Sequence, residues 1–270
     1  MTDQSTPGDP TTSRSGMALS RRGVLGAAGL GAAVLAGGGA QAARPLDKVT
    51  IYHVEGRRSQ RIIWLCEEIG APYEVMFKRG DIMGSINMIK AINPTMPLAP
   101  TVVFRGKTMI ESGGIVEYLM SQFPGGDKLA PAKTSPDYAD YLMWMHFAEG
   151  SAACRLGAEA TRIMASGDRT IKPTLMGGVY KIVGAQDIVD YLETYIAAHP
   201  YFGGNTFSGA DVMMDFVATY IAALPFDPAT YPKLKAWQQK VQARPAYQRA
   251  FKVGAPDGLE KYKSKPKKAM

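Results

Sequence analysis

Two adjacent arginines, Arg57 and Arg58, stand in the stretch YHVEGRRSQRIIWLCEEIG, between a strand-like segment and an amphipathic one. A guanidinium in such a loop binds carboxylates through paired hydrogen bonds, or stabilises a nearby anion by its charge. Two hydroxyl groups accompany the cations, because Ser59 follows the pair and Tyr52 precedes it. We therefore take this loop as the first candidate ligand site, with a solvated surface pair of arginines as the alternative.

A second candidate site lies at Glu111 and Ser112, which begin the apolar-periodic segment ESGGIVEYLMSQF. The free N–H groups at the start of a helix and the helix dipole favour an anion there. Simple capping of the helix is the alternative reading of the pair. The two roles are compatible.

The elements that must position these residues are a βαβ unit and a ββα unit. Strands are predicted where β-branched and aromatic residues concentrate, and helices where apolar residues recur with helical spacing. The short connection through a helix favours parallel pairing of the first two strands. The expected elements are a strand at 49–54, a helix at 59–69 ending before Gly70, a strand at 72–78, a short helix at 85–93, a hairpin of 101–104 and 108–110, and a helix from Ser112.

The chain becomes helical beyond a Pro/Gly-rich linker at 124–135. Long segments there carry apolar residues with helical periodicity. We expect these helices near 136–165, 176–198, 209–224 and 232–243. The architecture predicted from the pattern is thus an α/β domain at 44–123 joined to an all-helical domain at 136–252.

Five segments resemble, in order and spacing, the signature segments of the glutathione S-transferase superfamily. They are APTVV at 99–103, ESGGIVEYL at 111–119, YLMWMHFAEGS at 141–151, FSGADVMM at 207–214 and KLKAWQQKVQARPAYQRAF at 233–251. The resemblance covers roughly residues 48–251 and points to a bacterial branch related to the fungal-type enzymes. It implies a fold class of α/β plus all-α, with a thioredoxin-like N-terminal domain (βαβ–ββα) before an all-α C-terminal domain.

The resemblance also implies glutathione as the cosubstrate and assigns binding roles. A cis bond at Pro100 is expected to turn Ala99 outward, where its backbone pairs with the extended peptide. Ser112 is expected to bind the γ-glutamyl carboxylate, while Glu111 accepts a hydrogen bond from the ammonium group. Arg58 is expected to hold a glutathione carboxylate.

A transferase must in addition stabilise the glutathione thiolate, because a free thiol has a pKa of about 8.5. Ser59, Tyr52 and Arg57 are the catalytic candidates, and the choice among them and Arg58 stays open. Relatives usually read S-R-S-x-R in this loop, whereas this chain reads RRSQR at 57–61. Arg57 thus stands where these relatives have the first serine of the motif. A non-catalytic glutathione-fold protein for ligand binding or stress interaction is therefore the alternative.

The activity that the resemblance implies is attack of the activated thiol on an apolar electrophile, by conjugation, peroxide reduction, or ether or halide cleavage. A homodimer is expected, with neither a metal nor a nucleic acid as partner. The electrophile is expected between the domains, along the helix near 141–151. The expected lining residues are Tyr141, Trp144, Met145 and Ala148, with core packing as the alternative.

The first 43 residues differ in composition from the rest of the chain. In SRRGVLGAAGLGAAVLAGGGAQA, at 20–42, an arginine pair opens an Ala/Gly-rich run that is short for a membrane span, and a small-x-small pattern closes it. This resembles a signal for the twin-arginine export machinery. It predicts a periplasmic protein, membrane-tethered if the signal stays uncleaved, and a disordered linker is the alternative.

The net charge of +7 comes partly from the last ten residues, which hold five lysines and no acid. We expect a solvated basic tail at 253–270 rather than a nucleic-acid or membrane-binding arm. Cys66 falls on an apolar helical face and is predicted to be buried, so a disulfide with Cys154 is not expected.

Overall fold

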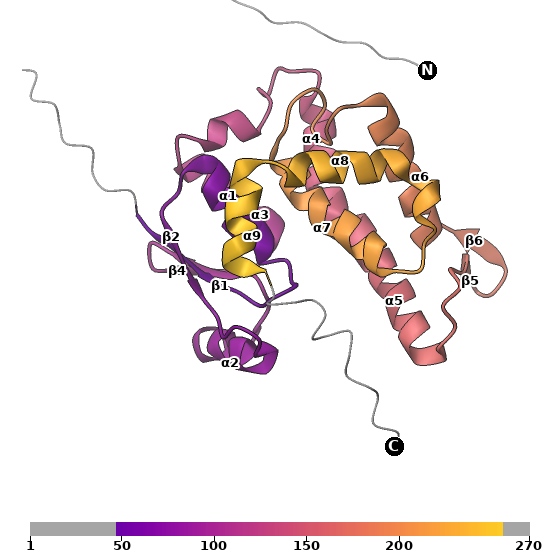
Figure 1. Ribbon diagram of the computed structural model, residues 1–270, viewed down its shortest axis with the longest axis horizontal. Helices are drawn as coiled ribbons and strands as arrows, with labels where there is room; N and C mark the ends of the chain where they lie inside the picture. Colours follow the sequence, from indigo (N-terminus) through magenta and orange to yellow (C-terminus); the bar gives the residue numbers. More distant parts are fainter. Residues whose placement is uncertain (1–46, 256–270) are drawn as a thin grey trace, which may run out of the picture. The chain divides into compact units, whose positions relative to one another are not determined.

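The computed structural model describes residues 47–255, so the predicted export signal and most of the basic tail lie outside the described residues. All the described residues belong to one compact unit. A four-stranded mixed sheet comes first and a mainly helical half follows (Figure 1). The predicted fold class, a thioredoxin-like α/β half and a helical half, is confirmed.

The sheet has the strand order β2–β1–β3–β4. β1 (Val49–Tyr52) pairs in parallel with β2 (Tyr73–Met76) and antiparallel with β3 (Thr101–Phe104), and β3 pairs antiparallel with β4 (Lys107–Met109). Helices α1 (Gln60–Ile69) and α3 (Ser112–Gln122) lie on one side of the strands, and α2 (Ile82–Ile92) lies on the other (Figure 1). Each element lies within a few residues of its prediction.

Helix α1 lies between the sheet and the helical half. Its buried residues include Trp64 and Cys66, and the latter is a free, buried cysteine as predicted. The helix ends at Gly70, whose left-handed φ of 67° is the conformation that glycine adopts most cheaply. Helix α9 (Pro245–Gly254) lies alongside α1 (Figure 1), so the last described helix packs against the first.

The helical half begins with one continuous helical run that changes its winding in the middle. Helix α4 (Tyr138–Phe147) passes into a π-helical turn, η2 (Ala148–Ala153), and then into α5 (Cys154–Ser166). The other elements are α6 (Ala185–Ala198), α7 (Gly209–Ala223), α8 (Pro232–Gln242) and the short 3-10 turns η1 (Gly126–Leu129) and η3 (Pro228–Thr230). Within residues 47–255, no helix is long and apolar enough to cross a membrane.

One segment of the second half differs from its prediction. The helix expected at 176–198 begins only at Ala185, because a hairpin of β5 (Thr174–Met176) and β6 (Tyr180–Ile182) precedes it. The turn consists of Gly177 and Gly178, with left-handed φ values of 60° and 74°. Two consecutive left-handed residues favour a tight hairpin turn. The second half is therefore helical apart from this hairpin.

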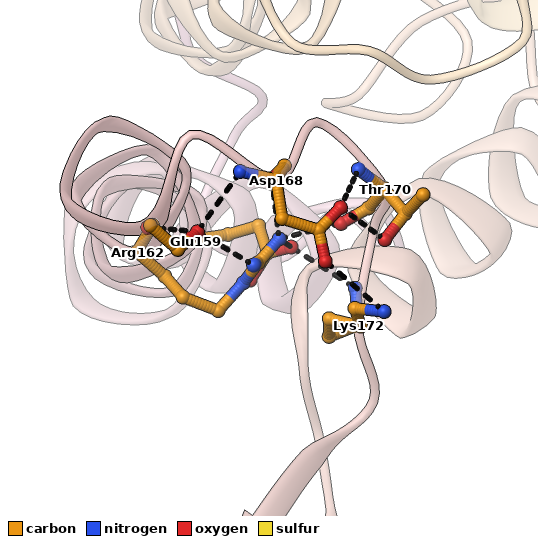
Figure 2. A network of polar contacts seen from close by, with 6 residues as sticks. Glu159, Arg162, Asp168, Thr170 and Lys172 are labelled. Atoms are coloured by element: carbon orange, nitrogen blue, oxygen red, sulfur yellow. Dashed lines mark hydrogen bonds and ion pairs between the residues drawn. The ribbon is translucent and has the colours of Figure 1, made fainter.

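A polar network fixes the loop that leads from α5 to the hairpin (Figure 2). Glu159 on α5 accepts from Arg162 at 2.8 and 3.0 Å and from the backbone N–H of Lys172 at 3.0 Å. Asp168 accepts from the N–H of Thr170 at 2.9 Å, and its carboxylate lies 3.2 Å from Lys172 Nζ. Figure 2 shows these side chains pointing toward one another across the loop, which accounts for its return to the helical half.

Helix α7 begins in a capping box, as the FSGADVMM segment predicts. Ser208 is its N-cap, and the buried Asp211 accepts from the Ser208 N–H at 2.9 Å. Asp211 also accepts from the Phe202 N–H and from Trp237 Nε1, each at 2.9 Å. One carboxylate thus joins the start of α7 to the preceding loop and to α8.

Replacing Asp211 with alanine should lower the free energy of unfolding by at least about 3 kcal/mol, because three buried donors lose their acceptor. Asp187 is the matched control, since it accepts from the Gly184 N–H at 2.9 Å at the half-exposed start of α6. Asp187→Ala should cost only about 1 kcal/mol. Urea unfolding of both variants measures the difference, and equal losses would contradict this account of α7.

Candidate functional site

A cavity of ≈ 210 Å³ brings together most of the residues that the resemblance assigns to glutathione. We call it the Pro100 cavity. Its lining residues are Arg58, Leu98, Ala99, Pro100, Glu111, Ser112 and Glu149. They come from the loop before α1, the loop before β3, the start of α3 and the π-helical turn after α4. The bond between Ala99 and Pro100 is cis, as predicted.

The start of α3 forms one wall of the Pro100 cavity. Glu111 precedes the helix with φ = 72°, a left-handed conformation that costs a residue with a side chain about 1–3 kcal/mol. Such strain is concentrated at ligand sites in proteins. The first turn of α3 has no side-chain cap, so its N–H groups stay available to an anion.

Two charged residues, Arg58 and Glu149, also line the cavity, and Arg61 contacts Glu149 and Ser112 without lining it. Arg58 Nε donates to the two carboxylate oxygens of Glu149 at 2.8 and 2.9 Å. Arg61 pairs with the same carboxylate, and also donates to Ser112 Oγ at 2.9 Å and to the Met213 carbonyl at 2.7 Å. Burial alone raises the pKa of Glu149, but the two guanidinium groups outweigh it and hold this pKa below its usual value. Glu149 is therefore ionised and offsets one of the two positive charges.

Ser59, a predicted catalytic residue, is fully buried and does not line the Pro100 cavity. Its Oγ lies 2.8 Å from His53 Nδ1 and accepts from the Val54 N–H at 3.1 Å. His53 Nε2 lies 2.7 Å from the Gly254 carbonyl, which only accepts, so Nε2 carries the proton and Nδ1 accepts from Ser59. The Ser59 hydroxyl is thus fully engaged in joining α1 to the end of α9.

The other two predicted catalytic residues also lie away from the Pro100 cavity. Tyr52 is half-buried in β1, opposite Met76 and Thr101. Arg57 lines a different cavity, described below. Of the loop residues considered for the thiolate, the structure therefore brings only Arg58 to the Pro100 cavity.

The residues expected to hold the electrophile are packed in the interior. Tyr141, Trp144, Met145 and Ala148 are all buried members of the main core. Trp144 alone contacts the rings of Phe147, Tyr191, Tyr195 and Phe202. The core role, which the sequence analysis kept as the alternative, is the one that their surroundings support.

Sequence reasoning did not single out Glu149, although it pairs with both Arg58 and Arg61. The available signal was its charge, since Glu149 is the acid that ends the largely apolar run YLMWMHFAE. An acid there, in a segment expected to lie between the domains, indicates an ion pair.

A second cavity of ≈ 120 Å³ lies among α1, α7 and α9, and sequence analysis gave no sign of it. We call it the Trp64 cavity. Its lining residues are Gly56, Arg57, Gln60, Arg61, Trp64, Asp215, Phe216, Thr219, Tyr247, Phe251 and Ala255. Among residues 47–255, no group of His, Cys, Asp and Glu side chains has an arrangement suited to a metal ion.

Comparison with known families and proteins finds similar sequences among glutathione S-transferases. The family described as glutathione S-transferase, C-terminal domain, matches residues 181–245. Glutathione S-transferase 3 of Schizosaccharomyces pombe is 28% identical over 213 residues, which cover 73% of this chain and 84% of the relative. The glutathione S-transferase-like protein OpS6 of Beauveria bassiana is 25% identical over 209 residues, covering 74% and 93%.

Solved structures show the same fold. A glutathione S-transferase of Actinobacillus pleuropneumoniae superposes with a TM-score of 0.64 at 20% identity, over 77% of this chain and 94% of that one. A theta-class enzyme of Xanthomonas axonopodis pv. citri, with glutathione bound, superposes with a TM-score of 0.58 at 23% identity. The superposition covers 76% of this chain and 97% of that one. The chain thus has the fold of these glutathione S-transferases, and its sequence is similar to the C-terminal-domain family and to the two relatives.

The buried His53 predicts a pH dependence of stability. Burial, with a smaller contribution from the charge of Arg79, lowers the pKa of His53 to about 4, although the hydrogen bond to Gly254 acts in the opposite direction. Unfolded histidine has a pKa of about 6.5, so between pH 6.5 and 4 the unfolded chain binds the extra proton. The contribution of neutral His53 to the free energy of unfolding is fully present above pH 6.5. It is lost on acidification toward pH 4, by up to about 3 kcal/mol.

His53→Gln removes the titrating group, so the stability difference between the two proteins should shrink steadily from pH 7 to pH 4. Urea unfolding at several pH values measures it. Parallel stability curves for wild type and variant would show that His53 does not stay neutral in the folded protein.

Proposed function

We propose that this protein is a glutathione S-transferase-like enzyme that binds glutathione in the Pro100 cavity and activates its thiol for attack on an apolar electrophile. The observation that carries the proposal is the convergence of Arg58, the Ala99–Pro100 pair and the Glu111–Ser112 pair on one cavity. These segments are distant in sequence, and each has a group that suits one part of a γ-glutamyl peptide.

In this proposal the peptide is bound at its γ-glutamyl end and along its backbone. Ala99 pairs with the extended backbone of glutathione. The γ-glutamyl carboxylate binds at the start of α3, where Ser112 Oγ already accepts from Arg61 and so keeps its own proton to donate. Glu111 accepts from the ammonium group, and its unusual backbone conformation holds it beside the helix start.

Arg58 is the group that we propose for the thiolate. Its Nε is held by Glu149, while its terminal nitrogens make no hydrogen bond within residues 47–255. A fixed positive charge beside a thiol favours the ionised form and lowers the thiol pKa. Ser59 is not available for this role, because its buried hydroxyl donates its hydrogen bond to His53 Nδ1.

In the conjugation reaction, the thiolate sulfur forms a bond to the electrophilic carbon, and the leaving group departs with its electron pair. The thiol proton is released to solvent when glutathione binds. Peroxide reduction and glutathione-dependent cleavage of an ether or halide need the same activated sulfur, and so fall under the same proposal.

The proposal also includes a homodimer and export to the periplasm by the twin-arginine machinery, with a membrane tether if the signal remains uncleaved. The resemblance of the chain to the glutathione S-transferase superfamily supports the homodimer. The arginine pair and the apolar run at 20–42 support the export.

A non-catalytic glutathione-binding protein is the second candidate function. It is favoured by the loop RRSQR, in which Arg57 replaces the first serine and lines the Trp64 cavity, while Ser59 is buried. Such a protein would use the same contacts to bind glutathione without lowering the pKa of its thiol.

The ultraviolet absorbance of the thiolate, followed against pH for bound glutathione, separates the two functions. We expect the bound thiol to titrate at least about one pH unit below its free value, and Arg58→Gln to abolish most of this shift because it removes the charge. Arg58→Lys keeps the charge and should retain part of the shift.

Glutathione that binds with an unshifted thiol pKa would favour the non-catalytic protein over the enzyme. Failure of glutathione to bind at all would contradict both.

A further inference from the structure

The hairpin of β5 and β6 is exposed to solvent over its whole length. Every residue from Lys172 to Val183 is exposed, and both outer edges of this two-stranded sheet are unpaired within the described residues. Most of the large side chains of the hairpin are nevertheless apolar: Leu175, Met176, Val179, Tyr180, Ile182 and Val183. Proteins rarely leave so many neighbouring apolar side chains in water, and such a patch marks an interaction surface.

The base of the hairpin is fixed to the helical half. On the β5 side, the N–H of Lys172 donates to Glu159 at 3.0 Å, in the network of Figure 2. On the β6 side, Arg155 of α5 donates to the Val183 carbonyl at 3.1 Å. Figure 1 shows the hairpin beside α5 and α6, on the side of the helical half away from the four-stranded sheet. The hairpin is therefore a projection with a fixed base.

Apolar side chains lie on both faces of the hairpin and at its turn. Residues opposite each other in an antiparallel pair share a face, and successive residues alternate between the faces. Met176 thus shares one face with its partner Tyr180, whereas Leu175 and its partner Lys181 lie on the other. The turn adds Val179, which is 75% exposed. A protein that covered one face would leave apolar side chains of the other face in water.

The hairpin is also too small to hold a protein partner or a second copy by itself. A stable protein interface takes about 20–30 residues from each side, whereas each strand here has three. A lysine in an edge strand opposes pairing of that edge with another strand, and Lys181 stands in the middle of β6. A lipid surface has no such size requirement, and it surrounds an inserted turn on all sides.

The length of the hairpin fits the interface of a bilayer. A strand of three residues spans about 10 Å, and apolar faces of proteins that lie in the interface are buried to about 5–10 Å. Tyr180 lies directly after the turn, and tyrosine is enriched at the level of the lipid headgroups.

The charge of this region favours anionic lipids. Between Asp168 and Asp187 the chain has three basic residues and no acid. Lys181 is the one nearest the turn, and its Nζ lies 3.0 Å from Asp187 in an exposed ion pair. An exposed pair of this kind is weak, so the ammonium group can exchange Asp187 for a lipid phosphate.

We propose that the hairpin tip, formed by Met176, Val179 and Tyr180, docks the protein on a bilayer that contains anionic lipids. The tip enters the headgroup region, and Lys181 binds lipid phosphates beside it. This interaction goes beyond the proposed glutathione chemistry, and it depends neither on that chemistry nor on the predicted export signal.

Co-sedimentation of the full chain with vesicles of phosphatidylglycerol and phosphatidylcholine tests the docking. Met176→Asp should lower the partition coefficient at least about tenfold, because it replaces a buried apolar contact with a repelled negative charge. Met83→Asp is the matched control, since Met83 is 64% exposed and Met176 59%, and the change in net charge is the same. Met83 lies in α2, away from the hairpin (Figure 1), so this variant should bind as wild type does.

Two measurements isolate the charge of the hairpin. Lys181→Gln should weaken binding to the anionic vesicles by roughly fivefold, because one basic residue at the lipid surface is lost. Added salt should weaken the binding of wild type more than that of Lys181→Gln, since it screens the attraction that the variant lacks.

Tyr180→Trp reports where the hairpin tip lies. The native tryptophans Trp64, Trp144 and Trp237 are buried, so the new one supplies the signal that responds to vesicles. We expect its emission to shift to shorter wavelength with anionic vesicles, and lipids brominated in their acyl chains to quench it. A shift that appears with rising protein concentration and without vesicles would place the tip against a second copy and overturn the proposal.

The proposal is also overturned if wild type does not bind anionic vesicles, or if Met176→Asp binds them as well as wild type does. The second result would assign the binding to a segment outside the hairpin. All the substituted side chains are exposed, so the variants should fold as wild type does. An unchanged circular dichroism spectrum of each variant shows that a loss of binding is not a loss of folding.

Discussion

The arrangement of both cavities depends on the ion pair and hydrogen bonds of one buried guanidinium group, that of Arg61. Moving an ion of this size out of water costs several kcal/mol, and the loss is recovered only through a counter-charge and hydrogen bonds. Arg61 finds them in Glu149, Ser112 and the Met213 carbonyl, which belong to the π-helical turn after α4, the start of α3 and α7. One side chain of α1 thereby fixes the sheet half against the helical half at the place where a ligand is expected.

This constraint explains why two adjacent arginines have different surroundings. Glu149, already held by Arg61, also accepts from Arg58 and so keeps that residue at the Pro100 cavity. On the opposite side of the loop, the Ser59–His53–Gly254 chain of hydrogen bonds joins the start of α1 to the end of α9. Arg57 then faces α7 and α9, where it meets an aromatic wall and no acid partner within the described residues. Arg57 and Arg58, which are adjacent in the loop before α1, thus line different cavities.

Much of the fold follows from the sequence because its signals are local. The strands around Ile51 and Val102, the glycine stop at Gly70 and the capping box at Ser208 each depend on neighbouring residues. The Gly177–Gly178 turn was equally local, but the helical periodicity of the following segment concealed it. That Ala99, Pro100, Glu111 and Ser112 line one cavity was predictable through their motifs. The roles of Glu149, Ser59 and Arg57 were not, because they depend on contacts between residues far apart in the chain.

The most direct measurement of the central claim is the crystal structure of the protein with glutathione bound. The account predicts that glutathione occupies the Pro100 cavity, with its sulfur nearer to the Arg58 guanidinium than to any other cationic or hydroxyl group of the loop before α1. A sulfur atom within hydrogen-bond distance of Ser59, Tyr52 or Arg57 would contradict it.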